Sequence, residues 1–522
     1  MSAAPSGQAY APLEGRARLW GTMALSAATF MNVLDSSIAN VSLPAIAGHL
    51  GVSPNQGTWV ITSFAVANAI GVPLTGWLSQ RFGQVRLFVA SVMLFVLFSW
   101  LCGLAPTMPL LIAARAMQGL VAGPMIPLSQ ALLLASYPRA LAGLAMALWA
   151  MTTLVAPVAG PLLGGWITDN FSWPWIFYIN VPVGLLAGAG AWVIYRHRDS
   201  VVRKLPIDHV GLALLVVWVG SMQLMLDLGK EYDWFNSPLI LTLGVVAAVG
   251  FAFFLAWELT DDHPVVDLRL FQRRNFWAGT ALTGVAYGLF FANVVLLPLW
   301  LQQFMGYTAT DAGMLMAPVG LLAIIFSPIV GRTVARVDPR WYGTFSFAVF
   351  ALVLWMRSHF NTQIDFGHLM VPTVIQGVAL AFFFIPLMTL TLSGLPPERM
   401  PSASGLSNFV RITAGAVGTS VATTLSESRS AMHHARLAEA IQPGSAAAET
   451  ALAGLRAAGM TTAQGLAQIN RLIDQQSFTL AVLDLFWVSS VIFLLLIPLV
   501  WITRRSQPAP GAAGPDAAAG AH

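Results

Sequence analysis

Three ionisable side chains stand out because they lie inside long apolar stretches of this 522-residue chain. Asp35 lies nine residues before Pro44, Arg115 lies six residues after Pro109, and Arg411 lies in a later stretch. An ionisable side chain inside a membrane is costly, so each is a candidate for function. At 1.5 Å per helical residue, Asp35 and Arg115 lie about 14 Å and about 9 Å below the same surface, on helices that could face each other.

Asp35 and Arg115 together have the chemistry of a proton-binding site. Burial favours the neutral carboxylic acid, whereas a neighbouring arginine favours the charged carboxylate. A carboxyl group held between these opposing effects can bind and release a proton as access alternates between two sides. We therefore interpret Asp35 as a proton carrier and Arg115 as its coupling or gating partner; the alternative is a static pair that fixes helix packing. For Arg411, snorkelling or binding to a carbonyl are the alternatives.

Uncharged polar side chains in the apolar stretches either line a central cavity or bond between helices. Aromatic and methionine side chains nearby would suit a loose, adaptable pocket, although each alone can equally pack in the interior or face lipid. The predicted cavity residues are Asn32, Gln118, Gln130, Tyr287, Phe291, Asn293, Gln376, Asn408 and Arg411.

Other chemistries find little support in the sequence. We find no nucleotide-binding loop, zinc-type histidine cluster or Ser/His/Asp grouping, so we expect no enzymatic activity, no metal and no cofactor. His433 and His434 form a pair without obvious further ligands. The lone Cys102 excludes an intramolecular disulfide and is interpreted as a core residue. The net charge of +4 does not suggest nucleic-acid binding.

The composition places most of the chain in a membrane. Apolar residues make up 57% and charged residues 9% of the chain, against roughly 25% charged residues in soluble domains. A helix needs about 20 apolar residues to cross a hydrocarbon core of about 30 Å. The first apolar stretch is longer than a signal-peptide core, so we expect it to be retained. The predicted spans are 19–44, 56–79, 87–105, 109–134, 141–166, 175–195, 210–228, 238–257, 276–302, 312–331, 341–357, 369–393, 403–425 and 479–503.

The basic residues give these fourteen spans an orientation. Of the 26 Lys and Arg residues, 18 fall on the side shared by the two ends of the chain and six on the other. The six are Lys230, Arg357, Arg429, Arg436, Arg456 and Arg471. Four of those six lie in one long loop, where charge has little influence on topology. The excess of positive charge predicts that both termini are cytoplasmic.

Four of the segments outside the predicted spans carry specific expectations. Residues 1–18 are a cytoplasmic N-terminal segment, and 504–522 are predicted to be a disordered cytoplasmic tail. The outer loop, 426–478, is expected to form two or three short amphipathic helices, at 433–440, 446–458 and 462–475, as a docking platform or a passive cap. Residues 258–274 mix acidic and apolar residues, which predicts a helix lying in the membrane interface.

Several motifs resemble the major facilitator superfamily. The stretch Gly76–Arg86 is similar to its loop signature at Gly76, Arg81 and Gly83, although Gln80 stands where an aspartate is usual. The stretch Arg115–Gly119 resembles the fourth-helix motif associated with proton transfer. The stretch Ala156–Gly165 resembles the fifth-helix motif of exporters, in which small residues and prolines shape a moving interface. The corresponding gating residues are Gly76, Arg81, Gly83, Pro157, Gly160, Pro161, Gly164 and Gly165.

Further motifs narrow the resemblance to the fourteen-span drug:proton antiporters. Leu34–Val41 resembles their first-helix signature. Four other stretches resemble the inner-membrane subunits of Gram-negative tripartite pumps: Gln56–Phe64, Trp257–Asp262, Leu395–Arg399 and Met432–Ala435.

The resemblance implies an all-α polytopic membrane protein with the major facilitator fold. Two six-helix bundles, 19–195 and 276–503, would flank a linker, 196–275, that carries the seventh and eighth helices. It further implies proton-coupled export of hydrophobic drugs across the bacterial inner membrane, together with a periplasmic adaptor and an outer-membrane channel. A narrower exporter of one metabolite or antibiotic is the alternative, and the fifth-helix motif argues against an importer.

Overall fold

The computed structural model describes residues 11–138, 141–202, 206–334, 336–439, 441 and 446–504. All regular elements in these ranges are helices. The first ten residues of the predicted N-terminal segment, and all of the predicted tail after residue 504, lie outside the described residues.

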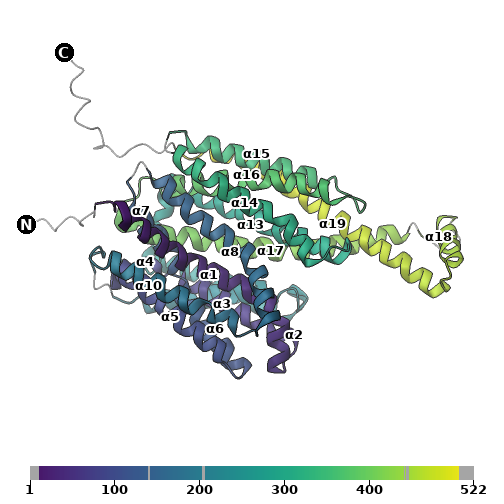
Figure 1. Ribbon diagram of the computed structural model, residues 1–522, viewed down its shortest axis with the longest axis horizontal. Coiled ribbons are helices and arrows are strands. Elements are labelled where there is room, and N and C mark those ends of the chain that lie inside the picture. The colour runs from purple at the N-terminus through teal and green to yellow at the C-terminus, as the bar shows by residue number, and fades with distance from the viewer. Residues whose placement is uncertain are drawn as a thin grey trace, which may run out of the picture.

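The helices form two groups that lie side by side (Figure 1). The first group is α1 (Gly15–Leu50), α2 (Pro54–Gly57), α3 (Trp59–Gly71), α4 (Thr75–Phe82), α5 (Gln84–Leu104), α6 (Met108–Ala122), α7 (Met125–Ser136), α8 (Ala142–Asn170), α9 (Trp175–Tyr178) and α10 (Asn180–Tyr195). The second group is α13 (Arg274–Phe304), α14 (Ala309–Thr333), α15 (Pro339–Arg357), α16 (Phe366–Thr391), α17 (Met400–Glu439) and α19 (Thr462–Val500). Between them in sequence come α11 (His209–Leu228) and α12 (Pro238–Thr260), which pack against each other.

Every predicted span falls on one of these helices or on a broken pair of them. Within the described residues, nine helices are long and apolar enough to cross a membrane by length and composition alone, or ten if α3 and α4 count as one span. The four other predicted spans fall on α1, α8, α15 and α17, of which α1 and α17 carry more polar residues. The all-α polytopic fold is therefore confirmed, and the count of fourteen crossings stays a prediction.

A sharp bend separates α3 from α4 within the predicted span 56–79. The two helices meet at 62° across residues 72–74, where Pro73 has no N–H to continue the backbone ladder. Glycines allow α3 to lie very close to α6 above this bend. A Cβ atom on Gly71 would lie 2.5 Å from the carbonyl oxygen of Leu120, so only glycine fits there.

The two groups meet at the end of the molecule where α1 starts and α19 finishes, which we call the terminal end (Figure 1). There, Gly143 of α8 packs against Gly331 of α14, and a Cβ atom on Gly331 would lie 2.6 Å from the Gly143 carbonyl oxygen. Gly405 of α17 also lies close to the bend, since a Cβ atom on it would be 3.1 Å from the Val72 carbonyl oxygen. The bundles are thus closed against each other at the terminal end.

The outer segment differs from the expected set of short helices. α17 is one helix of 40 residues and α19 one of 39, so the stretches expected at 433–440 and 462–475 continue the neighbouring spans. Only α18 (Ala446–Ala457) is separate, and it projects from the end opposite the terminal end (Figure 1). The prediction is confirmed for 446–458, which forms α18, and is wrong for the two flanking stretches, whose polar composition suggested a break. Both stretches are helical, and a capping box at Thr461 begins α19 at the start of the second one. Residues 440 and 442–445 lie outside the described part of this segment.

The prediction of an interfacial helix over 258–274 is also wrong. α12 ends at Thr260, and only the short 3₁₀ helix η3 (Leu268–Gln272) follows before α13. The apolar side chains of Val265, Val266 and Leu270 are buried within the protein instead of lying in lipid. Their burial satisfies the same amphipathic pattern without a membrane surface.

Candidate functional site

Asp35 of α1 and Arg115 of α6 form a buried ion pair in the first group of helices. Arg115 Nη1 lies 2.6 Å from Asp35 Oδ2, and the two side chains are 1% and 0% exposed. The similar depths inferred from Pro44 and Pro109 therefore correspond to direct contact. Because an unpaired charge would be very costly here, each of these side chains depends on the other.

Three helices supply partners to this pair, and we call the whole group, which joins four helices, the Asp35 cluster. Asp35 Oδ1 accepts hydrogen bonds from Asn180 Nδ2 of α10 at 2.7 Å and Gln118 Nε2 of α6 at 3.2 Å. Arg115 donates to Gln118 Oε1 at 2.8 Å and, through Nε, to the Val60 carbonyl oxygen of α3 at 3.0 Å. Gln118 thus bridges acid and base, so a change at Asp35 alters contacts on α1, α3, α6 and α10 together.

Aromatic rings enclose the arginine. The Arg115 guanidinium lies 4.2 Å from the Phe64 ring centroid and 5.5 Å from that of Phe177. We did not predict Asn180, Val60 or either ring. Asn180 was recoverable, because it is a polar side chain inside the predicted span 175–195; the Val60 contact is a backbone carbonyl and leaves no signal in residue type.

The predicted gating residues of α8 pack against α1 at Ser37 and Ile38, two and three residues after Asp35. A Cβ atom on Gly164 would lie 2.8 Å from Ile38 Cγ1 of α1, whereas one on Gly165 would meet nothing closer than 3.9 Å. A Cβ atom on Gly160 would lie 2.6 Å from Ser37 Cβ, and the Ser37 hydroxyl donates to the Pro157 carbonyl oxygen at 3.1 Å. Gly160 and Gly164 therefore bring α8 into contact with α1. Pro161 belongs to α8, but its side chain lies outside the described part of the structure.

The predicted gating loop joins both bundles at the terminal end. A Cβ atom on Gly76 would lie 2.8 Å from Ser402 Cα of the second group. Gly83 has φ +91° and faces Asp199, whose carboxylate accepts the Val85 N–H at 2.9 Å. Arg81 lies at the end of α4, with its guanidinium 5.3 Å from the Trp77 ring centroid.

Asp199 is a residue that we did not predict for this loop. Besides Val85 N–H, its carboxylate accepts the Arg86 N–H at 3.3 Å and lies 3.5 Å from Arg86 Nε. It thus caps the first turn of α5, where a negative charge is favourable. The loop signature lacks its usual aspartate at Gln80, and Asp199 brings a carboxylate to the same loop from the far end of α10.

A second polar group, which we call the Arg411 cluster, lies where the two groups of helices face each other. Gln130 Oε1 of α7 accepts hydrogen bonds from Asn408 Nδ2 at 3.0 Å and from the Ser404 hydroxyl, both of α17. Asn408 Oδ1 accepts from Arg411 Nη2 at 2.7 Å. Arg411 therefore does not snorkel; it is 3% exposed and binds the side-chain carbonyl oxygen of Asn408, which links it to the opposite bundle.

Two of the predicted aromatic residues belong to the Arg411 cluster. The guanidinium lies 4.9 Å from the Tyr287 ring centroid, and the rings of Tyr287 and Phe291 lie 4.5 Å apart. Trp149 of α8 and Phe384 of α16 complete the surroundings at 5.7 Å and 5.6 Å from the guanidinium. Gln130, Tyr287, Phe291, Asn408 and Arg411 are thus brought together.

The remaining predicted cavity residues bond between or along helices. Asn32 Nδ2 donates to the Ala122 carbonyl oxygen at 3.1 Å, and Asn293 Nδ2 donates to the Leu289 carbonyl oxygen at 2.6 Å. Gln376 accepts a hydrogen bond of 2.7 Å from the buried Arg357, which we had placed on the outer surface. Gln118 belongs to the Asp35 cluster. For Asn32, Asn293 and Gln376 the structure thus shows the packing contacts of the alternative interpretation.

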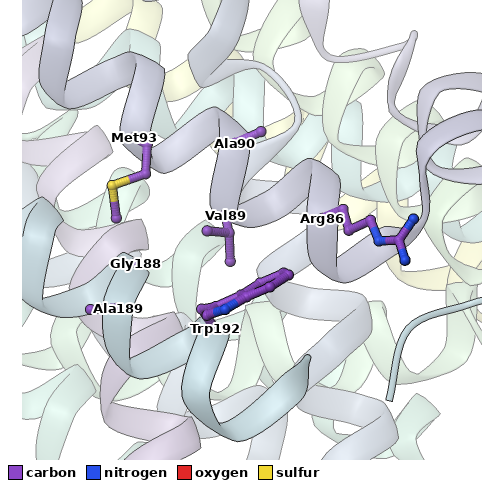
Figure 2. A pocket seen from close by; sticks show the side chains of 7 residues that line it. All are labelled: Arg86, Val89, Ala90, Met93, Gly188, Ala189 and Trp192. Atoms are coloured by element: carbon purple, nitrogen blue, oxygen red, sulfur yellow. The ribbon is translucent and has the colours of Figure 1, made fainter. Parts of the chain in front are cut away.

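An apolar groove lies apart from both clusters, between α5 and α10 (Figure 2). It has a volume of about 500 Å³, and Arg86 and Trp192 lie among its lining residues. The other lining residues are Val89, Ala90, Met93, Gly188 and Ala189. We had not predicted this groove, whose lining is apolar apart from Arg86.

No group of three or more His, Cys, Asp or Glu side chains that could hold a metal occurs among the described residues. His433 and His434 belong to the outer part of α17 and pair with acidic residues of α19. His433 Nε2 lies 3.0 Å from Asp484 Oδ2, and His434 Nε2 lies 3.3 Å from Asp474 Oδ1. Together with the Arg429–Asp484 pair at 3.1 Å, these contacts join α17 to α19.

Comparison with known proteins agrees with this arrangement. The chain is 50% identical over 504 residues to the Multidrug export protein EmrB of Escherichia coli K12, covering 96% of this chain and 98% of that protein. It is 48% identical over 495 residues to the Fatty acid resistance protein FarB of Neisseria gonorrhoeae, covering 95% and 98%. These identities confirm the predicted resemblance to the multidrug export branch.

A solved structure and a family profile place the fold. The human organic anion transporter MFSD10 (TETRAN) is similar in structure with a TM-score of 0.56, covering 93% of this chain and 100% of that one, at 13% identity. Because the identity is so low, this likeness concerns the fold alone. The profile of the Major Facilitator Superfamily matches residues 25–419. This chain belongs to the Major Facilitator Superfamily.

Proposed function

We propose that this protein exports hydrophobic, structurally varied compounds from the cell in exchange for protons, and that it is no enzyme. The observation that carries the proposal is the Asp35 cluster, a buried carboxylate held by one arginine and tied to four helices. The relatives named for multidrug export support the choice of substrates.

The geometry suggests how a proton would act on the cluster. Protonation of Asp35 would remove the charge that balances Arg115 and weaken the 2.6 Å ion pair. Arg115 would then be held mainly by Val60, Gln118 and the Phe64 ring. Because Ser37 and Ile38, two and three residues after Asp35 on α1, contact Gly160 and Gly164 of α8, this change would reach the α1–α8 contact through α1. The coupling would give the predicted gating residues their roles at two places. At the α1–α8 contact these residues are Pro157, Gly160, Pro161, Gly164 and Gly165. At the terminal end they are Gly76, Arg81 and Gly83.

The protein would work in the bacterial inner membrane with both termini in the cytoplasm. The excess of basic residues at the terminal end supports this orientation. The two bundles, 19–195 and 276–503, would alternate access about the Arg411 cluster. The segment 426–478 would contact a periplasmic adaptor that leads to an outer-membrane channel, which is supported by the projection of α18 beyond the bundles (Figure 1).

Proton coupling is tested by transport in proteoliposomes. We expect Asp35→Asn to abolish the accumulation of a fluorescent lipophilic compound that an imposed pH gradient drives in the native protein. The variant should still exchange substrate for substrate across the membrane, which shows that it is folded and binds. Asp484→Asn is the control, because it removes a carboxylate that is paired with Arg429 outside the cluster. If Asp35→Asn accumulates substrate as well as the native protein does, the coupling role of Asp35 is wrong.

A further inference from the structure

Arg411 is a buried cation without a neutralising partner in the described chain. It is 3% exposed, takes part in no ion pair among the described residues, and its Nε has no hydrogen-bond partner. Its one hydrogen bond goes to Asn408, a neutral amide. Arginine does not release its proton in proteins, and a buried charge normally has a charged partner. The site therefore carries an uncompensated positive charge.

The contrast with Arg115 shows what is missing. Arg115 is equally buried, but Asp35 lies 2.6 Å away and balances it. The rings around Arg411 give a modest cation–π attraction, which stabilises an arginine without neutralising it. An anion at Arg411 would complete the site as Asp35 completes the other.

Unsatisfied polar atoms extend from Arg411 along two facing helices. On α17, the Ser407 hydroxyl lies four residues before Arg411 and so on the same face. On α13, the Thr280 and Thr283 hydroxyls precede Tyr287 on one face, and α13 packs against α17. None of these three hydroxyls has a hydrogen-bond partner in the described structure. They are unpartnered donors on the two helices that carry Arg411 and Tyr287.

The rings supply an apolar surface for the rest of a ligand. Tyr287 of α13 and Phe384 of α16 come from one bundle, and Trp149 of α8 comes from the other. A ligand held by Arg411 would thus touch both bundles at the level where Gln130 already joins Asn408. Ligand charge and ligand apolar surface would be recognised at adjacent positions.

We propose that the Arg411 cluster is the binding site for the negatively charged group of lipophilic organic anions, whose apolar body packs on Trp149, Tyr287 and Phe384. This inference rests on the proposed export function and names a substrate class for it. An anionic ligand would neutralise Arg411 and accept hydrogen bonds from its free Nε. A neutral compound of the same shape would leave the buried charge unbalanced and bind less tightly.

Two naphthalene dyes provide a matched pair of probes. 1-Anilinonaphthalene-8-sulfonate carries a permanent negative charge, and N-phenyl-1-naphthylamine is the same molecule without the sulfonate. Binding to the full-length protein in lipid nanodiscs is measured by energy transfer from tryptophan, with empty nanodiscs as the blank. We expect the native protein to bind the sulfonate at least about tenfold more tightly, because charge-assisted hydrogen bonds are strong in a desolvated site.

Substitutions at Arg411 locate the preference. Arg411→Gln keeps a donor for Asn408 but removes the charge, and should reduce the preference to about twofold or less. Arg411→Lys keeps the charge and should retain a preference of about threefold or more, with the loss reflecting its poorer geometry. Arg357→Gln is the matched control, because Arg357 is also buried, has no ion pair among the described residues and has an unpartnered Nε, but its Nη2 bonds to Thr373 and Gln376 within its own bundle. It should leave the preference unchanged.

The outcomes separate this inference from the export function. Equal affinity of the native protein for both dyes, or an unchanged preference in Arg411→Gln, would overturn the anion site. Proton-driven accumulation of a neutral compound in the same preparation would show that the export function stands regardless. Absence of any proton-driven transport by the native protein, with the dye preference intact, would instead contradict the export function alone.

Discussion

At the scale of single residues, Arg115 and Arg411 differ in what surrounds them. Arg115 donates to a carboxylate, an amide oxygen and a backbone carbonyl, so its forked guanidinium group is held at several N–H positions. Arg411 donates to one amide and faces three rings. The surroundings of Arg115 suit a charge that stays in place while Asp35 gains or loses a proton. The surroundings of Arg411 suit a charge that binds a ligand.

The fork of Arg115 leads to a prediction about stability. Lysine has one ammonium group and cannot reach Val60, Asp35 and Gln118 together, so Arg115→Lys should lower the free energy of unfolding by about 2–4 kcal/mol. The thermal midpoint of the purified protein would report the loss. Arg86→Lys is the control, because that side chain is 67% exposed and should shift the midpoint little. Equal midpoints for both variants would contradict a structural dependence on the Arg115 fork.

At this scale the sequence predicted charged residues better than their neutral partners. Asp35 and Arg115 were found because a charge in an apolar stretch is rare. Asn180 was missed as an uncharged polar side chain in a predicted span, and Arg357 was placed on the surface since it ends α15. Asp199 reaches the gating loop from over a hundred residues away in sequence, and neither its residue type nor its position indicates which helix it caps.

At the scale of helices, two adjacent glycines of α8 provide a matched pair. Gly164→Ala would place its Cβ atom 2.8 Å from Ile38 Cγ1, so α1 and α8 must separate. Gly165→Ala meets nothing closer than 3.9 Å and also favours the helix. We expect Gly164→Ala to lose about 1–3 kcal/mol of stability and most transport, and Gly165→Ala to match the native protein. Thermal midpoints and efflux rates measure both; similar losses at the two positions would show that the α1–α8 contact is not what matters.

The outer helices lead to a second prediction at this scale. Replacing 440–460 with a short glycine–serine linker removes α18 and leaves the spans of α17 and α19 intact. We expect this variant to lose co-purification with the periplasmic adaptor while it retains proton-driven transport in proteoliposomes. Exchanging only Glu449 for Gln is a mild control that keeps α18. Co-purification that persists after removal of α18 would contradict the assignment of α18 as the adaptor contact.

Helix positions were predictable where apolar length decides them, and helix ends were not. Apolar length predicts spans at 403–425 and 479–503, and the structure extends these helices to Glu439 in α17 and back to Thr462 in α19. Apolar length says where a helix must be but not where it stops. Polar stretches between spans have similar compositions whether they form a loop, a helix extension or a partly buried irregular segment such as 258–274. Composition therefore does not distinguish these three structures.

At the scale of the whole molecule, the two bundles are closed at the terminal end by contacts that must separate for access to alternate. Thr75→Cys with Gly405→Cys would place the two Cβ atoms about 3.3 Å apart, close to disulfide geometry. We expect oxidation of this double variant to stop transport and reduction to restore it. Each single variant should transport under both conditions, since the native Cys102 is buried. Full transport by the cross-linked protein would show that this end does not open.

The length of α17 and α19 would turn a small tilt of their bundle into a large displacement of their outer ends. A helix of 40 residues is about 60 Å long, and ion pairs with α19 stiffen its outer part. When the bundle that holds these helices tilts by about 10°, their far ends sweep roughly 10 Å, as the length of such a rod requires. A small rearrangement around a buried carboxylate would thus become a large displacement of α18. A protein bound to α18 would therefore be moved once in each transport cycle.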